Sequence, residues 1–396
     1  MKTSPAEAAA SPGTAREPRG DARIESLAIR WALIAFVVVA LVSGFLMRGG
    51  RLPLGGDDSF GRITAWVGGA AAGIVFAIAY TGANRRAEQA WRRRLPLPRR
   101  VFDTIVLTIA FATVSALSVE AATRLFQRGF VGMTIDAVGG AALAGACGAF
   151  LAYIAGVFGA RVVTANLAAL ATLVLFIGTM ASMLTAPDER WWEYHFSQLG
   201  NQAGSTSAAA FNGALILTGL IITVFAGYAA RDAARGLALR GLGPAPDGDA
   251  PDTQGGDATA TDFWSPRRRR RAVSGMLVAI GVCMMVVGLV HDAVNTPVHV
   301  GAASGMVVVF GLLAAFSLTL LPGIPRSFHV LTIGVVAGIA VSIVLWIPIG
   351  YYALTGVEFV SAGLLFAWFV VFARTIAAYA QDGADPRAGA PVPDAR

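Results

Sequence analysis

Apolar stretches of about twenty residues recur along the whole chain and are separated by short polar segments. A helix of that length spans the roughly 30 Å hydrocarbon core of a bilayer. The pattern predicts an all-α, polytopic helical membrane protein with about ten spans: Ala28–Leu46, Thr64–Gly82, Val101–Leu117, Ile135–Gly159, Val162–Leu184, Ala208–Tyr228, Ala272–Val290, Val298–Leu321, His329–Ile349 and Gly356–Tyr379.

The division between the fourth and fifth spans depends on a single break. Only Gly159-Ala160-Arg161 interrupts a very long apolar stretch there. One helix of that length would overrun the bilayer, so we predict a tight turn at Gly159-Ala160.

Composition supports a membrane protein. Hydrophobic residues make up 56% of the 396 residues and charged residues only 14%, whereas soluble domains carry about 25% charged residues. The net charge of +7 would favour nucleic acid as a partner in a soluble protein. Here the arginines are better explained as topology determinants that face anionic headgroups, and no nucleic-acid partner is expected.

The distribution of basic residues predicts the orientation. With ten spans and an N-terminus in the cytoplasm, 25 of the 31 Lys and Arg residues lie on the cytoplasmic side. Both termini are therefore expected in the cytoplasm, with the chain in the plasma (inner) membrane and lipids as its surroundings. The first apolar run has no convincing cleavage site and is expected to be a retained span. The oligomeric state is left open.

The domain organisation follows from these runs. We predict a disordered cytoplasmic tail over residues 1–26, a four-helix membrane module over 27–160 and a six-helix membrane domain over 161–379. A polar linker over residues 240–266 interrupts the six-helix domain on its cytoplasmic side, and a second tail covers 380–396. These three polar segments have too few apolar residues to order themselves.

Candidate chemistry is concentrated at the opposite, outer end of the predicted bundle. Three of the four histidines lie in two short segments, 191–197 and 291–299, and an acid begins the last span. Ionisable groups at membrane depth are costly and indicate function by default. The candidate ligand-binding residues are Trp191, Trp192, His195, Ser197, Asn212, His291, Asp292, Asn295, His299 and Glu358.

Simpler roles exist for the same residues. A histidine at a helix end is often only a satisfied polar group, and Glu358 could pair with Arg124 or Arg128. The chain has no P-loop, dinucleotide fingerprint, nucleophile elbow or tightly spaced metal motif. A zinc site would therefore require His195, His291 and His299 to converge in space.

The second half resembles a known family. The residues that carry the resemblance are His195, Ser197, Leu199 and Gly200, then Ala210, Phe211 and Asn212, then His291, Asn295 and His299, and finally Glu358. Over about residues 162–379 the chain resembles the bacterial membrane family catalogued as domain of unknown function 998. It is more distantly similar to the damage-regulated autophagy modulators and their relatives in glycolipid-anchor remodelling. That resemblance implies lipids as the ligand class.

Three functional hypotheses follow. The first is a non-enzymatic protein that handles a lipid or amphiphile in an outer-leaflet pocket. The second is a membrane hydrolase in which the three histidines hold zinc and Glu358 or Asp292 activates the metal-bound water. The third is a proton-coupled permease that uses His291 and Glu358. It is disfavoured because carriers place their polar site near the midplane of the membrane.

Overall fold

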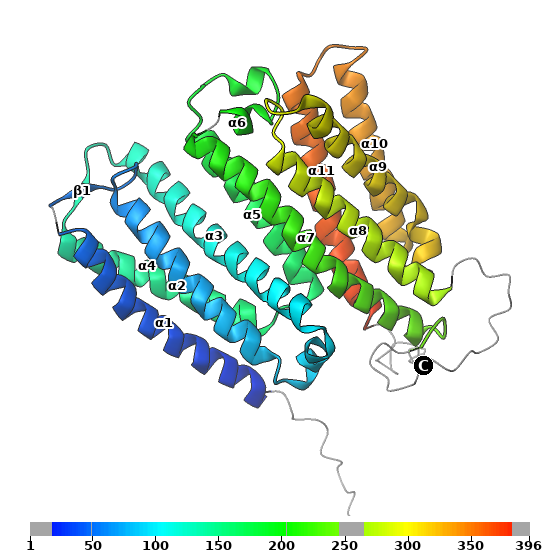
Figure 1. Ribbon diagram of the computed structural model, residues 1–396, viewed down its shortest axis with the longest axis horizontal. Coiled ribbons are helices and arrows are strands. Elements are labelled where there is room, and N and C mark those ends of the chain that lie inside the picture. Colours follow the sequence, from blue (N-terminus) through cyan, green and yellow to red (C-terminus); the bar gives the residue numbers. More distant parts are fainter. Residues whose placement is uncertain (1–17, 49, 203, 245–264, 382–396) are drawn as a thin grey trace, which may run out of the picture.

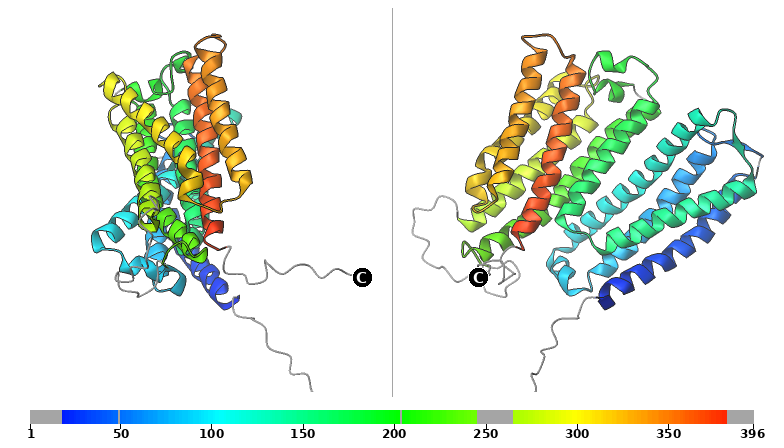
Figure 2. Two further views of the ribbon diagram at one scale, coloured as in Figure 1. Left: turned by 90° about the vertical axis from the view of Figure 1, so that its right-hand side faces the viewer. Right: turned by 180° about the vertical axis from the view of Figure 1, so that it is seen from behind.

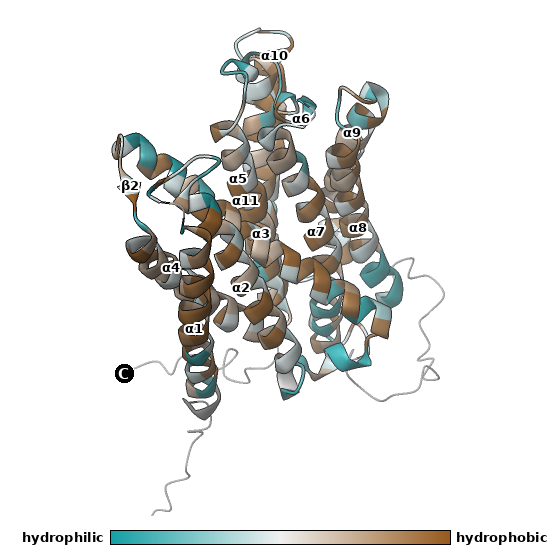
Figure 3. Cartoon of the chain, turned by 60° about the vertical axis from the view of Figure 1, so that its left-hand side comes forward, coloured by the Kyte–Doolittle hydropathy of each residue, from teal (hydrophilic) through white to brown (hydrophobic). Residues whose placement is uncertain are grey.

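The computed structural model describes residues 18–48, 50–202, 204–244 and 265–381. Ten of the helices in those ranges are long and apolar enough to cross a membrane, so the chain is an all-α polytopic membrane protein as predicted. Hydrophobic residues cover the middle of the helices and hydrophilic residues gather at the two ends of the bundle (Figure 3).

The first four long helices are α1 (Pro18–Leu46), α2 (Phe60–Ala83), α3 (Leu97–Gly129) and α4 (Ala137–Ala160). A 3-10 helix, η1 (Ala87–Arg94), joins α2 to α3. A short antiparallel pair, β1 (Leu52–Pro53) with β2 (Thr134–Ile135), ties the link after α1 to the link before α4. These helices pack mainly on one another, and α3 lies beside the rest of the chain (Figure 1).

The remaining elements are α5 (Thr164–Leu184), η2 (Trp191–Glu193), α6 (Gln198–Asn201), α7 (Thr206–Leu239), α8 (Pro266–Leu289), α9 (Thr296–Leu320), α10 (Arg326–Trp346) and α11 (Leu354–Tyr379). α7 is central and packs against α5, α8 and α11, as the view from behind also shows (Figure 2). The predicted division into a four-helix module and a six-helix domain stays a prediction.

Specific polar contacts join α2 and α3 to α7. The hydroxyl groups of Tyr80 and Tyr228 are 2.9 Å apart. The Arg99 guanidinium donates to the Thr223 carbonyl oxygen at 3.0 Å. Because a buried polar group without a partner costs free energy, these bonds favour one fixed docking of the two groups of helices.

The predicted spans are confirmed, but several boundaries move, and the turn between α4 and α5 lies at Arg161, just after the predicted Gly159-Ala160. α1 begins at Pro18, so residues 18–26 of the predicted tail are helical. The carboxylates of this first part contact α4: Asp21 pairs with Arg161 at 3.0 Å, and Glu25 accepts from Tyr153 at 2.7 Å. The rest of that tail, most of the linker and nearly all of the C-terminal tail lie outside the described residues.

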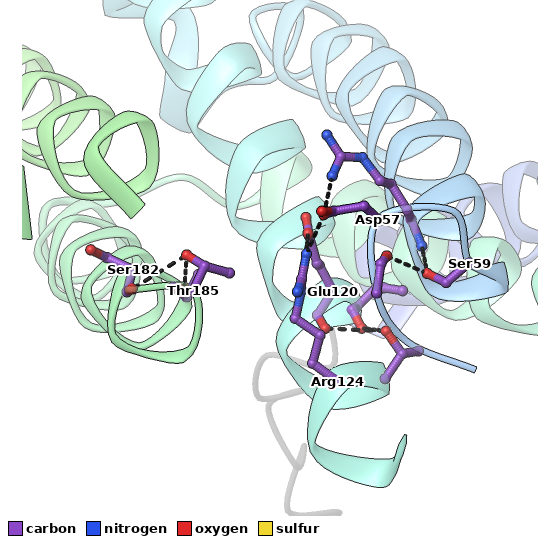
Figure 4. Close-up of polar contacts among 11 residues, drawn as sticks. Asp57, Ser59, Glu120, Arg124, Ser182 and Thr185 are labelled. Carbon is purple, nitrogen blue, oxygen red and sulfur yellow. Dashed lines mark hydrogen bonds and ion pairs between the residues drawn. The ribbon is translucent and has the colours of Figure 1, made fainter. Parts of the chain in front are cut away.

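α3 and α7 are each longer than their apolar runs. α3 continues to Gly129 because its charged residues find partners near the helix: Arg124 pairs with Glu120 at 2.9 Å and with Asp57 at 3.0 Å (Figure 4). α7 continues to Leu239, and its Asp232 accepts a 2.5 Å hydrogen bond from Thr164. A hydropathy profile ends a span before such charged residues, although the helix itself can continue through them.

Candidate functional site

One end of the bundle carries η2, α6, the link between α8 and α9, and the start of α11. We call it the histidine end, after His195, His291 and His299. The opposite end, which carries η1 and the starts of α1, α3 and α8, is called the arginine end. Figure 1 shows the segment with α6 lying over the histidine end beside α11.

Aromatic packing holds the segment between α5 and α7 in place. The Trp191 ring contacts Phe196 edge to face, with centroids 5.4 Å apart. Phe196 in turn stacks on Phe359 of α11 at 6.0 Å. Trp192 and Tyr194 project outward and are more than half exposed. Such rings, which carry one polar atom, suit the boundary between headgroups and hydrocarbon.

The centre of the site is a hydrogen bond between Ser197 and His299. The Ser197 Oγ lies 2.8 Å from His299 Nε2, and His299 Nδ1 lies 2.9 Å from the Val290 carbonyl oxygen. A carbonyl oxygen only accepts, so Nδ1 carries a proton and donates to Val290, while Nε2 shares a hydrogen bond with the Ser197 hydroxyl. The ring is buried, with a relative exposure of only 6%.

Glu358 anchors the same segment to α11. Its Oε2 accepts from the Phe196 backbone N–H at 2.6 Å. The carboxylate is also within electrostatic range of His195 and His299. The alternative pairing of Glu358 with Arg124 is wrong, because Arg124 pairs with Glu120 and Asp57, and the pairing with Arg128 stays a prediction.

The other candidates have different partners. His195 belongs to the cluster, since its Nε2 lies 3.8 Å from Asp292 Oδ2. Asn295 and Asn212 have positioning roles: Asn295 caps α9 by accepting from the Val298 N–H at 3.1 Å, and Asn212 donates to the Gly200 carbonyl at 3.0 Å. The Nδ1 atom of His291 is buried and makes no hydrogen bond to another described group.

The three histidines do not form a ready metal site. Among the described residues, no three His, Cys, Asp or Glu side chains are grouped so that they could hold one metal ion. His299 uses both ring nitrogens for Ser197 and Val290, so neither is left for a metal in this arrangement. Zinc binding stays a prediction that the geometry does not favour.

Two backbone groups of the site could not be identified from the sequence. The Val290 carbonyl fixes the His299 tautomer, and the Phe196 N–H holds Glu358. Backbone groups have no signature in the residue pattern. Asn201 could be found from the sequence only as one more polar residue near the candidates. Its Oδ1 accepts from the Ala293 N–H at 3.2 Å, and this bond joins α6 to the α8–α9 link.

We expect Glu358→Ala to release the segment between α5 and α7. The substitution leaves the half-buried Phe196 N–H without its acceptor, which costs up to about 1–3 kcal/mol. Hydrogen–deuterium exchange of peptides covering residues 191–201 should therefore rise about tenfold or more. Glu358→Gln, which keeps an acceptor oxygen, should show a much smaller rise. Equal exchange in both variants and the wild type would contradict the assignment.

No protein-family model matches the chain, and neither a curated protein nor a solved structure matches it. The resemblance stated from the residues of the second half therefore stays a prediction.

Proposed function

We propose that this membrane protein binds the polar head of a lipid or another amphiphile at the histidine end. The observation that carries the proposal is the hydrogen bond between Ser197 and the buried His299, within electrostatic range of Glu358. Ionisable groups at membrane depth cost free energy, so their presence indicates a functional role.

The surroundings fit an amphiphile because polar and apolar groups meet there. His195 and Asp292 face each other at 3.8 Å, a separation too long for a strong hydrogen bond, so both can turn toward a polar head. Large apolar or aromatic side chains on the segments that form this end are exposed: Trp192, Tyr194, Val294, Tyr351 and Phe359. A head on the polar groups and a tail along these side chains would satisfy both surfaces.

The arginine distribution supports placing the histidine end on the outer face of the plasma membrane. The basic residues concentrate at the arginine end, and cytoplasmic segments carry the excess of Lys and Arg. The amphiphile would then come from the outer leaflet.

Native mass spectrometry of the detergent-purified protein with added phospholipids and glycolipids tests this function. Ser197→Ala removes the hydroxyl group and leaves His299 Nε2 unpartnered. We expect it to weaken retention of the preferred lipid about five- to tenfold, as the loss of about 1 kcal/mol or slightly more implies. Ser342→Ala is the matched control, because among the described residues its hydroxyl bonds to its own helix, at the Ile339 carbonyl. Identical lipid retention in both variants would overturn the proposal.

A second function is favoured by the same pair. A serine hydroxyl on a histidine Nε2, with Nδ1 held by an acceptor, is the arrangement of a nucleophile and its general base. Ser197 Oγ would attack an ester carbonyl while Nε2 takes its proton and later gives it to the leaving alcohol. Covalent labelling by a fluorophosphonate probe, with loss of fluoride, tests this. Labelling that disappears in Ser197→Ala would favour acyl transfer, and no labelling in the folded wild type would leave binding alone.

A further inference from the structure

A cavity of about 500 Å³ lies at the arginine end, far from the Ser197–His299 pair. It is formed by the end of α2, η1 and the start of α3, at the turn seen at the lower end of these helices (Figure 1). Its volume is within the usual range for ligand sites. Its lining includes Arg85, Arg92, Arg93, Arg100, Leu97 and Val101.

Arg92 is the central group of this cavity. It is only 2% exposed, and its guanidinium lies over the Tyr80 ring at 4.3 Å. Apart from that contact with Tyr80, none of its three guanidinium nitrogens has a hydrogen-bond partner among the described residues. Asp103 lies within electrostatic range of Arg92 but makes no hydrogen bond to it, so a further anionic partner would stabilise this buried charge.

The cavity carries an excess of positive charge. Four arginines line it, together with a single acid, Asp103. That acid already pairs with Arg99, whose Nε lies 2.9 Å from Asp103 Oδ1. The Nε of Arg100 is also buried and has no hydrogen-bond partner in the part of the chain that the structure describes. The unpaired donors are therefore guanidinium groups, which match the oxygens of a phosphate in geometry and charge.

The other side of the cavity is apolar and open to the surroundings of the bundle. Leu97, Val101 and Ile105 line it, and each is about half exposed or more. Their spacing of four residues places them in one row along α3. An apolar row leading away from a cluster of arginines suits a molecule with a phosphate head and an acyl chain.

We propose that this cavity binds a phosphate group, with Arg92 and Arg100 as its principal donors. The phosphate of an anionic phospholipid is the source that the apolar row favours, and a soluble phosphate compound shares the same chemistry. The site is independent of the function proposed for the histidine end, because none of its lining residues belongs to that network.

The test measures two kinds of ligand on the purified full chain. Native mass spectrometry reports retention of phosphatidylglycerol against neutral phosphatidylcholine. Thermal unfolding reports stabilisation by inorganic phosphate and pyrophosphate. We expect Arg92→Gln and Arg100→Gln each to weaken binding of the phosphate ligand tenfold or more, and Arg92→Lys to restore part of it. Arg326→Gln, which removes an exposed arginine at the start of α10 on the same end, should leave binding unchanged.

The outcomes separate the two sources. Loss of phosphatidylglycerol retention without any effect of free phosphate identifies the lipid, and loss of stabilisation by phosphate or pyrophosphate identifies a soluble compound. If Arg92→Gln does not fold, Arg100→Gln decides. Binding that is equally strong in Arg100→Gln and Arg326→Gln, or absent in the wild type for every probe, would overturn the proposal.

Discussion

Replacing Gly281 by alanine is expected to cause the largest loss of stability. At the crossing of α7 and α8 the two backbones meet, and a Cβ at Gly281 would lie 2.6 Å from the Gly219 carbonyl oxygen and 2.7 Å from Thr223 Oγ1. Two backbone segments on packed helices cannot separate without losing neighbouring contacts. Overpacking of this kind costs about 1–3 kcal/mol, and we expect a clear drop in Tm in detergent and a lower yield of monodisperse protein.

The control for this experiment lies on the same helix. A Cβ at Gly275 of α8 would meet nothing within 4 Å. Gly275→Ala should therefore raise Tm slightly, because alanine favours the helix over glycine by roughly 0.5–1 kcal/mol. The two substitutions are chemically identical, so opposite signs report the packing. The same small change in both variants would show that α7 and α8 do not cross at Gly219 and Gly281.

His299→Ala is expected to have the largest effect on ligand binding. The imidazole joins Ser197 to the Val290 carbonyl, so its removal leaves two groups of the site without their partner. We expect lipid retention at the histidine end to fall more than tenfold, since hydrogen-bonded groups left unpaired cost about 1–3 kcal/mol each.

A double-mutant cycle isolates the pair. Ser197→Ala and His299→Ala act on one hydrogen bond, so the double variant should lose much less binding than the two single losses combined. Asn295→Ala serves as the comparison, because it removes a helix cap and not a member of the pair. Its effect should add to that of Ser197→Ala. Additive losses for Ser197 and His299 would show that the two residues do not work together.

The sequence predicted the helices well because apolar length is a direct consequence of bilayer thickness. It predicted the break between α4 and α5 from three residues, but the turn lies at Arg161, just after the predicted Gly159-Ala160. It ended α3 and α7 too early, since charged residues on helices were read as the end of a span although partners such as Glu120 and Thr164 accommodate them. These partners come from packing, which periodicity does not contain.

The site was predicted as a set of residues but not as an arrangement. The histidines, Ser197 and Glu358 stood out because chemically capable residues are rare in this chain. Their arrangement depends on the backbone groups of Val290 and Phe196, which the residue pattern does not reveal. Asn212 and Asn295 position the backbone and do not belong to the hydrogen-bonded pair. The arginines between α2 and α3 were explained by topology alone. That Arg92 is buried depends on how η1 folds back over the ring of Tyr80.

The central claim is that an amphiphile binds at the Ser197–His299 pair, and photo-crosslinking tests it most directly. A lipid carrying a photoreactive group close to its head would be irradiated with the protein, and the adducts would be mapped by peptide mass spectrometry. We predict adducts concentrated in residues 191–201 and 291–300 and near Phe359, with most of them lost in Ser197→Ala. Adducts spread evenly over the exposed apolar faces of α1 and α10, unchanged in that variant, would contradict the account.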